Sequence, residues 1–347
     1  MPKLIEKIRA HQAAAGEETK DGEPTGKPFI AFEYYPPRTD DGVANLYKRL
    51  GRMAQQEPLY VDFTWGAGGS TADLTLELTV ESKKRFGLEP NMHLTCTNMP
   101  VEKITTALEG AKAAGITNIV ALRGDPPAGE AKWEAVEGGF ACALDLVKYI
   151  KEKHGDFFGI SVAGYPEGHP SVINKVEEGR ALSDAEKGRV VTMEDGEYVC
   201  SDADFAAEIA YLKEKVDAGA ELIITQMFFD VDVFVSFVAA CRAAGIAVPI
   251  LPGIMVIQAY GGFKRMTAFC KSRVPKEVHA RLDAVKDDSE AVKRVGVEIG
   301  TEMSRALLAA GVPGLHFYCL NLEKVVVGIM ENLGLAKPVD DAEGADE

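Results

Sequence analysis

The sequence predicts an α/β fold, a (β/α)₈ TIM barrel with an N-terminal helix and an insertion after strand 5. Eight short apolar runs alternate with segments of helical periodicity. The runs are rich in β-branched and aromatic residues, as in strands that are buried on both faces. Eight consecutive strand–helix units favour a closed barrel, in which functional residues gather at the carboxyl ends of the strands. A doubly wound open sheet is the structural alternative.

The predicted strands are brief, and each ends at a polar residue or at a Gly or Pro cluster. They cover residues 29–35, 60–64, 92–95, 118–122, 158–163, 222–226, 249–254 and 315–318. Helical patterns fill the intervals, with glycines such as Gly155 and Gly219 placed as stop signals. The clearest helices cover residues 101–114, 140–154, 201–218, 231–244 and 289–310.

The two ends of the chain differ in composition from its middle. Residues 1–28 predict a helix and a polar loop, residues 29–335 the barrel, and residues 336–347 an acidic, disordered tail. Within the barrel, residues 171–200 form the insertion, which contains a small hairpin at residues 193–200.

Composition narrows the function classes. The 347 residues include 38 Lys and Arg against 53 Asp and Glu, a formal net charge of −15. This balance argues against nucleic acid or an anionic membrane as the main partner. No apolar run approaches the roughly 18 residues of a transmembrane helix. The six cysteines are widely spaced, and the start of the chain lacks the apolar core of a signal peptide. We therefore expect a cytoplasmic protein with reduced, mostly buried thiols. We separately expect a homo-oligomer.

Common catalytic signatures do not match. Residues 66–71 lack the third Gly of GxGxxG, residues 22–28 lack the Ser or Thr of a phosphate-binding loop, and residues 159–164 are not GxSxG. The sequence has no HExxH, and its six His form no ligand cluster, so no metal is predicted.

Polar residues at the ends of the apolar strands are the stronger signal. Glu33 lies among aromatic residues, where a carboxyl group is poorly solvated in its charged form and can serve as a general acid near neutral pH. The structural alternative is that Glu33 forms an ion pair with Arg38 or another cation. The small residues at 66–70 let the backbone approach a flat or phosphorylated ligand closely, although a plain tight turn has the same composition.

Later strands repeat the pattern. His93 is a candidate site residue or a hydrogen-bonded core residue. The charged residues Arg123 and Asp125 are costly to bury unless they are paired or bind a ligand. Tyr165 and His169 lie in a loop that two prolines stiffen.

Gln226 is either a capping residue or a partner for a heterocycle, because its amide both donates and accepts hydrogen bonds. Since all these residues follow strands of one predicted barrel, they point to an enzyme with a flat polar ligand. The reaction itself stays open at this level.

Eight stretches resemble the methylenetetrahydrofolate reductase family, in family order and over nearly all of residues 29–335. They are FEYYPPRT at 32–39, FTWGAGGST at 63–71, HLTCTNM at 93–99, ALRGDPP at 121–127, VAGYPEGHP at 162–170, KVDAGAELIITQMFFD at 215–230, PGIMVIQAYGGF at 252–263 and GVPGLHFYCLN at 311–321. The resemblance implies a (β/α)₈ barrel that binds FAD. It covers the catalytic barrel and not the regulatory domain that eukaryotic members add.

The resemblance also implies a reaction and catalytic residues. NADH or NADPH would reduce FAD, which would pass hydride to 5,10-methylenetetrahydrofolate in a ping-pong reaction that yields 5-methyltetrahydrofolate. Glu33 matches the acid that protonates the folate nitrogen, Asp125 an acidic residue between flavin and pterin, and Gln226 a folate contact. Tyr260 matches a further substrate-binding position.

The remaining implied positions contact FAD. They are Thr64, Trp65, Ala67, His93, Arg123, Gly124, Asp125, Ala143, Tyr165 and His169, and on one helical face Glu208, Tyr211 and Lys215. One departure concerns Leu322, where the family usually has Arg near the folate, with Lys324 as a potential substitute. Two alternatives to the reductase are a folate-binding barrel without flavin, similar to methyltransferases, and a non-catalytic scaffold.

Overall fold

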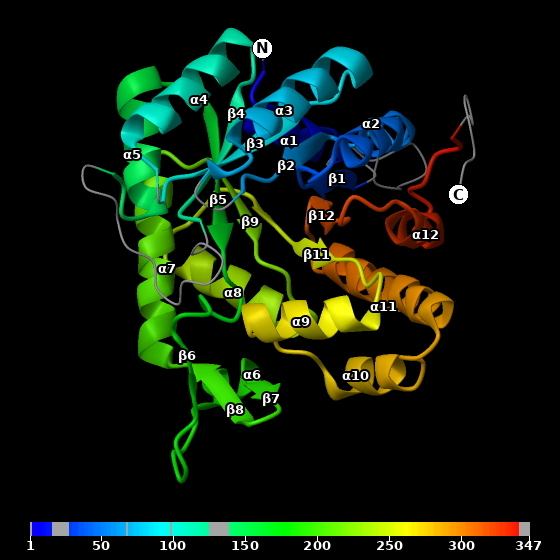
Figure 1. The fold of residues 1–347 in the computed structure, drawn as a ribbon. Helices are drawn as coiled ribbons and strands as arrows, with labels where there is room; N and C mark the ends of the chain where they lie inside the picture. The colour runs from blue at the N-terminus through cyan, green and yellow to red at the C-terminus, as the bar shows by residue number, and fades with distance from the viewer. Residues whose placement is uncertain (1, 16–27, 67–68, 98, 125–138, 340–347) are drawn as a thin grey trace.

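The barrel is present and is closed by the seventh strand. The computed structural model describes residues 2–15, 28–66, 69–97, 99–124 and 139–339. Its nine parallel strand segments run in the spatial order β10-β9-β5-β4-β3-β2-β1-β12-β11 (Figure 1). The segments are β1 (Phe29–Tyr34), β2 (Tyr60–Phe63), β3 (Pro90–Thr95), β4 (Asn118–Leu122), β5 (Gly159–Gly164), β9 (Leu222–Thr225), β10 (Ile250–Leu251), β11 (Gly253–Met255) and β12 (Gly314–Tyr318). Because β10 and β11 are consecutive in the chain, the order returns on itself, and the predicted α/β barrel is confirmed.

The seventh strand was predicted as one segment over 249–254, but the structure divides it at Pro252. Proline has no N–H to give to a sheet, although its carbonyl still accepts a hydrogen bond from His316 N at 3.3 Å. A Cβ atom on Gly253 would lie 2.2 Å from the carbonyl oxygen of Thr225 and 2.5 Å from the Tyr318 hydroxyl. Glycine therefore permits the close crossing of three strands at this point.

The helices lie outside the strands, as predicted from periodicity. They are α2 (Asp40–Ala54), α3 (Ala72–Phe86), α4 (Val101–Ala113), α5 (Ala143–His154), α7 (Asp202–Asp217), α8 (Val231–Ala243), α9 (Tyr260–Cys270), α10 (Lys276–Asp283), α11 (Ser289–Ala309) and α12 (Lys324–Asn332). α5 begins three residues later than predicted because the Asp145 carboxylate accepts hydrogen bonds from the N–H groups of Ala141 and Cys142 and so caps the helix. In the described ranges, no helix has both the length and the apolar character needed to cross a bilayer.

The N-terminal helix α1 (Leu4–Ala15) plugs the amino end of the barrel. Its Leu4 and Ile8 are buried against inward-facing residues such as Phe29 and Tyr60. The Leu4 N–H donates to the Asn118 side chain at 2.7 Å. Among the described residues, the helix thus covers the amino end of the barrel interior.

The insertion folds as a separate three-stranded antiparallel sheet beside the barrel, near α9 (Figure 1). It contains β6 (Ile173–Lys175), α6 (Asp184–Gly188), β7 (Val191–Met193) and β8 (Gly196–Cys200). β7 and β8 pair antiparallel, so the predicted hairpin is confirmed and is two residues longer than expected on its first strand.

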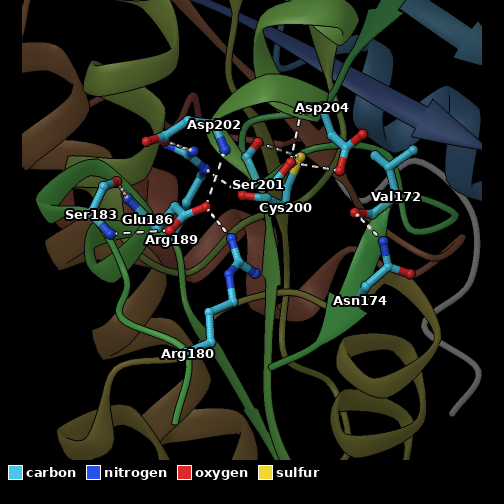
Figure 2. Close-up of polar contacts among 10 residues, drawn as sticks. All are labelled: Val172, Asn174, Arg180, Ser183, Glu186, Arg189, Cys200, Ser201, Asp202 and Asp204. Atoms are coloured by element: carbon cyan, nitrogen blue, oxygen red, sulfur yellow. Dashed lines mark hydrogen bonds and ion pairs between the residues drawn. The ribbon is translucent and has the colours of Figure 1, made fainter. Parts of the chain in front are cut away.

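Buried charged residues fasten the insertion to the first turn of α7 (Figure 2). Arg189 is 8% exposed, donates from Nε to the Cys200 carbonyl at 3.1 Å and pairs with Asp202. Glu186 accepts from the backbone N–H of Asp202 at 3.2 Å and pairs with Arg180. The insertion therefore positions the start of α7, whose later residues line the cavity described below.

A second attachment comes from the segment after α9. Lys271 donates to the carbonyl oxygens of Pro170 at 2.8 Å and Ile173 at 2.5 Å. Arg273 donates to the Val190 carbonyl at 2.9 Å. The insertion thus connects α7 to α9 across the open end of the barrel.

None of the six cysteines forms a disulfide, and all but Cys142 are buried. The expectation of thiols that are not in disulfides and are mostly buried is confirmed. At the other end of the chain, Gln56 makes two hydrogen bonds with the backbone of Lys337, at 2.8 and 2.9 Å. Residues 340–347 of the predicted tail lie outside the described ranges.

Candidate active site

One cavity of about 550 Å³ opens at the carboxyl ends of the strands, a volume within the usual range for cofactor and substrate sites. It brings together most of the predicted site residues. Its lining includes Glu33, Thr64, Trp65, His93, Arg123, Gly124, Ala143, Tyr165, His169, Glu208, Tyr211, Lys215 and Gln226. Ala67 and Asp125 lie outside the described residues.

Acidic and imidazole groups meet at one end of the cavity. Glu33 and Asp62 are register partners on β1 and β2, and both line the cavity with His93 of β3. His93 Nε2 lies 3.0 Å from Asp62 Oδ2 and 3.4 Å from Glu33 Oε2. Asp62 is completely buried, and the Glu33 side chain is 18% exposed. Two carboxyl groups therefore face one imidazole nitrogen.

The charge of His93 depends on this arrangement. Burial by itself would lower the pKa of His93, but the Glu33 charge and the Asp62 hydrogen bond and charge outweigh it, and the pKa is raised. The imidazolium form is thereby favoured beside Glu33.

A second histidine approaches the same carboxylate oxygen of Glu33. His316 Nε2 is 3.5 Å from Glu33 Oε2, and its Nδ1 is 2.9 Å from the Tyr60 hydroxyl. The rings of Tyr60 and His316 stack at 5.7 Å between centroids. Nearby, the Tyr318 hydroxyl donates to the Thr225 carbonyl at 2.6 Å. These buried contacts fix the wall on which Glu33 lies.

Cationic residues occupy the opposite end of the cavity. Arg123 approaches His169 at 3.3 Å between the guanidinium and Nε2. Burial, with the charges of Arg123, Lys215 and Lys271, lowers the pKa of His169 to about 4. His169 is therefore neutral at physiological pH and can accept or donate hydrogen bonds without adding charge.

Lys215 of α7 is the most buried of these cations. Its Nζ donates to the Ala163 carbonyl at 3.0 Å and lies 4.9 Å from the centre of the Tyr211 ring. Burial lowers its pKa to about 8, against an opposing effect of Glu208. Burial likewise raises the pKa of Glu208. A phosphate group beside Lys215 would restore the charged lysine.

The cavity fits a flat heterocycle joined to a diphosphate. Trp65 Nε1 and Thr95 Oγ1 are buried, and neither has a hydrogen-bond partner among the described residues; both residues line the cavity. Gly124 has φ +100°, and a Cβ atom there would lie 2.9 Å from Thr97 Oγ1. FAD would use all three features of this lining. The unpaired donors could bond its ring, glycine lets the backbone come close, and the two cations Arg123 and Lys215 could face its diphosphate.

Other predicted contacts have different surroundings. Gln226 accepts from the Met227 N–H at 2.8 Å, which orients its amide at the cavity. Tyr260 does not belong to the cavity lining, and its hydroxyl donates to Asp283 at 2.6 Å. Leu322 is 42% exposed, and Lys324 pairs with Glu290 at 3.0 Å.

Sequence reasoning missed Asp62, His316 and Tyr318. Glu33, Asp62 and His93 offer ligand atoms within 4.8 Å of one another, the one group of metal-site composition in the described part of the chain. The 3.0 Å hydrogen bond between two of them indicates a shared proton in that space. An Asp and a His inside otherwise apolar strands were the available signal, because such residues are rarely buried without a partner.

Comparison with known proteins agrees with this geometry. Residues 18–334 match the profile of the family described as "Methylenetetrahydrofolate reductase". The chain is 51% identical over 333 residues to "Methylenetetrahydrofolate reductase (NADH) 1" of Zea mays, covering 96% of this chain and 51% of that protein. It thus spans about half the length of the plant relatives it matches.

A bacterial relative is matched over nearly its whole length. "5,10-methylenetetrahydrofolate reductase" of Escherichia coli is 34% identical over 310 residues, covering 89% of this chain and 92% of that protein. Among solved structures, a Clostridium thermocellum protein described as binding two copies of 5-methyl-5,6,7,8-tetrahydrofolic acid has a TM-score of 0.56 at 13% identity. That match covers 96% of this chain and 98% of that one and supports the fold.

Proposed function

The chain belongs to the methylenetetrahydrofolate reductase family, and we propose that it uses NADH or NADPH to reduce 5,10-methylenetetrahydrofolate to 5-methyltetrahydrofolate. The observation that carries this proposal is the cavity at the carboxyl ends of the strands. It joins the partly exposed Glu33 carboxyl group to the cationic Arg123 and Lys215. A proton donor and an anion-binding region are the two features that such a reaction requires of the protein.

FAD bound in the cavity would carry hydride from the nicotinamide nucleotide to the folate in two half-reactions. The described residues would hold it at several points. Trp65 and Thr95 would donate hydrogen bonds to the ring system, and Arg123 and Lys215 would neutralise the diphosphate. Tyr211 and Glu208 on α7 complete this wall.

Glu33 would hold the proton that opens the folate ring to an iminium, which then accepts hydride. Gln226 would hydrogen-bond the pterin from the opposite wall, with its amide oriented by Met227. Asp125 is proposed to lie between the two ring systems, although it lies outside the described residues. General-acid assistance of this kind contributes about 10²–10⁴-fold to a rate.

The names of the similar proteins guide the choice of nucleotide and folate to test. The name of the maize relative specifies NADH, so NADH is the first nucleotide to test. The structural neighbour that binds a methylated folate is compatible with a folate in this fold. The alternative, a folate-binding barrel without flavin, requires that the cationic end of the cavity bind something else.

Purification followed by rapid mixing tests the proposal. The protein should carry a flavin absorbance spectrum, which NADH or NADPH bleaches and 5,10-methylenetetrahydrofolate restores. A protein that purifies without flavin and gains none when FAD is added would overturn the proposal. A flavoprotein that NAD(P)H reduces but folate does not reoxidise would overturn the substrate assignment alone.

A further inference from the structure

Asp62 is the buried group at the site that the proposed reaction does not yet use. Its side chain is completely buried, and His93 is its ion-pair partner among the described residues. The second carboxylate oxygen, Oδ1, has no hydrogen-bond partner there. A buried carboxylate with so few partners is costly unless a positive charge compensates it, and His93 is the group placed to do so.

The geometry places the Nε2 proton of His93 where it can pass to Glu33. Nε2 of His93 faces Asp62 Oδ2 at 3.0 Å and Glu33 Oε2 at 3.4 Å, so a proton on Nε2 lies between the two carboxyl groups. His93 is 8% exposed and lines the cavity. It can therefore take a proton from water when the cavity empties.

The alternative source is blocked. His316 also approaches Glu33, at 3.5 Å, but it is completely buried and its other nitrogen faces the buried Tyr60 hydroxyl. A proton given from that side could be replaced only by leaving a buried tyrosinate, and burial raises the pKa of Tyr60 well above its usual value.

We propose that Asp62 is a positioning residue that holds His93 as an imidazolium, and that His93 returns a proton to Glu33 after each turnover. This inference rests on the proposed function. Reduction of the folate by NAD(P)H consumes one proton, which Glu33 gives to the folate nitrogen. The imidazolium Nε2–H bond then breaks, an O–H bond forms on Glu33, and the neutral His93 takes a proton from solvent. The balance is one proton from water per methyl group formed.

The groups that face His93 define the pH dependence. They are Glu33 from β1 and Asp62 from β2, whose oxygens lie 3.4 and 3.0 Å from Nε2, and His316 from β12 contacts the same Glu33 oxygen. Removing the Asp62 charge leaves burial opposing the imidazolium, with the Glu33 charge alone favouring it. The variant Asp62→Asn should therefore lower the pKa of His93 by about one unit or more.

Two measurements on the flavin-containing protein test this. In ¹⁵N-histidine NMR, the His93 signal, assigned with His93→Gln, should titrate at least about one pH unit lower in Asp62→Asn than in the wild type. In steady-state turnover, the basic limb of the pH–rate profile should move to correspondingly lower pH in Asp62→Asn, while the rate of flavin reduction by NAD(P)H in rapid mixing keeps its profile. Ser161→Ala is the matched control, because it removes a buried hydroxyl from the same barrel interior, 3.4 Å from Asn91 Nδ2.

Several outcomes would overturn the inference. An unmoved His93 titration in Asp62→Asn would do so, as would equal slowing of both half-reactions. Either result with an active wild type leaves the proposed function intact, whereas a wild type that never reduces folate removes both. If Asp62→Asn does not fold, His93→Gln decides, because steady-state turnover should then slow while the first folate half-reaction, for which Glu33 already holds its proton, keeps its rate; steady-state turnover as fast as that of the wild type refutes the proton return.

Discussion

The two ends of the cavity differ in how their buried charges are paired. At the acidic end, Glu33 and Asp62 share the imidazole of His93 within hydrogen-bond or ion-pair distance. At the cationic end, Lys215 contacts the Ala163 carbonyl and the Tyr211 ring. The first cluster is compensated by direct contacts, whereas Lys215 is opposed only by the charge of Glu208, which does not prevent burial from lowering the pKa of the lysine.

This difference between the two ends assigns proton transfer to the acidic end and ligand binding to the cationic end. A compensated cluster keeps its protonation states whether or not a ligand is present, which suits proton transfer. An uncompensated buried cation is unfavourable until an anion arrives, so part of its cost is recovered as affinity. Net charge conceals this division, because the chain carries −15 overall and yet lines one part of its cavity with cations.

The largest expected effect comes from breaking the acidic end at Glu33. Glu33→Gln keeps the size of the side chain but removes its acidic proton. Reoxidation of the flavin by 5,10-methylenetetrahydrofolate should slow by about 10²–10⁴-fold, while reduction by NAD(P)H should change little. Rapid mixing of each half-reaction measures both, and equal loss in the two would show that Glu33 has a structural role instead.

The next largest effect comes from neutralising the cationic end. Lys215→Met preserves volume, and it should weaken flavin binding by roughly 10–100-fold because a charge-assisted contact with the diphosphate is lost. The flavin-free variant should nevertheless be more stable than the wild type at pH 7, by on the order of 2 kcal/mol.

The sign follows from the pKa of Lys215, which burial lowers to about 8. Below pH 8 the lysine is charged in both the folded and unfolded states, and the full cost of burying the charge is present. As the pH rises from 8 toward the ordinary lysine range, the folded protein loses its proton first and the wild type gains stability. The stability difference between the two proteins should therefore shrink above pH 8 in denaturant unfolding; a constant difference would contradict the assignment.

The sequence predicted the cationic end better than the acidic end. Arg123 and Lys215 follow from family resemblance and from charged residues at strand or helix positions, since parallel strands bring their carboxyl ends to one edge. Asp62 could not be placed, because its contact with His93 depends on the register between β2 and β3, which no local pattern specifies.

The same limit explains the other differences. The strand at 249–254 was expected to be continuous because its apolar pattern is, but Pro252 removes a donor from the ladder and divides it. The helix at the N-terminus was expected from periodicity, yet nothing local indicates that Leu4 and Ile8 seal the barrel. Contacts between segments distant in sequence are set by tertiary packing and not by periodicity.

An intermediate effect on stability and flavin affinity should come from the insertion. Because the insertion holds the start of α7, a change there should affect the cationic end of the cavity and not the acidic end. Arg189→Ala removes the bond to the Cys200 carbonyl, the Asp202 pair and the stacking on Phe205 at 4.4 Å. We expect a loss of about 2 kcal/mol in unfolding free energy and several-fold weaker flavin binding, because α7 carries Lys215.

Lys187→Ala is the matched control for Arg189→Ala. It removes a salt bridge in the same insertion, with Asp184, in which both side chains are more than half exposed, so stability should change by less than about 0.5 kcal/mol. Unfolding in urea and flavin titration measure both variants. If Arg189→Ala destabilises the protein without changing flavin affinity, the insertion supports the fold but not the cofactor helix.

The smallest expected effect comes from adding a positive charge at position 322, which tests whether charge near the cavity affects folate binding. Leu322 is 42% exposed and lies two residues after Leu320, which lines the cavity. Lys324, a nearby cation, already pairs with Glu290. Leu322→Arg should lower the KM for the folate up to about fivefold, close to 1 kcal/mol, because an exposed cation attracts the carboxylates of the folate tail. The gain should disappear in high salt, where exposed charges are screened. Leu322→Gln controls for polarity without charge, and an equal gain in that variant would mean that the mouth recognises shape and hydrogen bonds instead of charge.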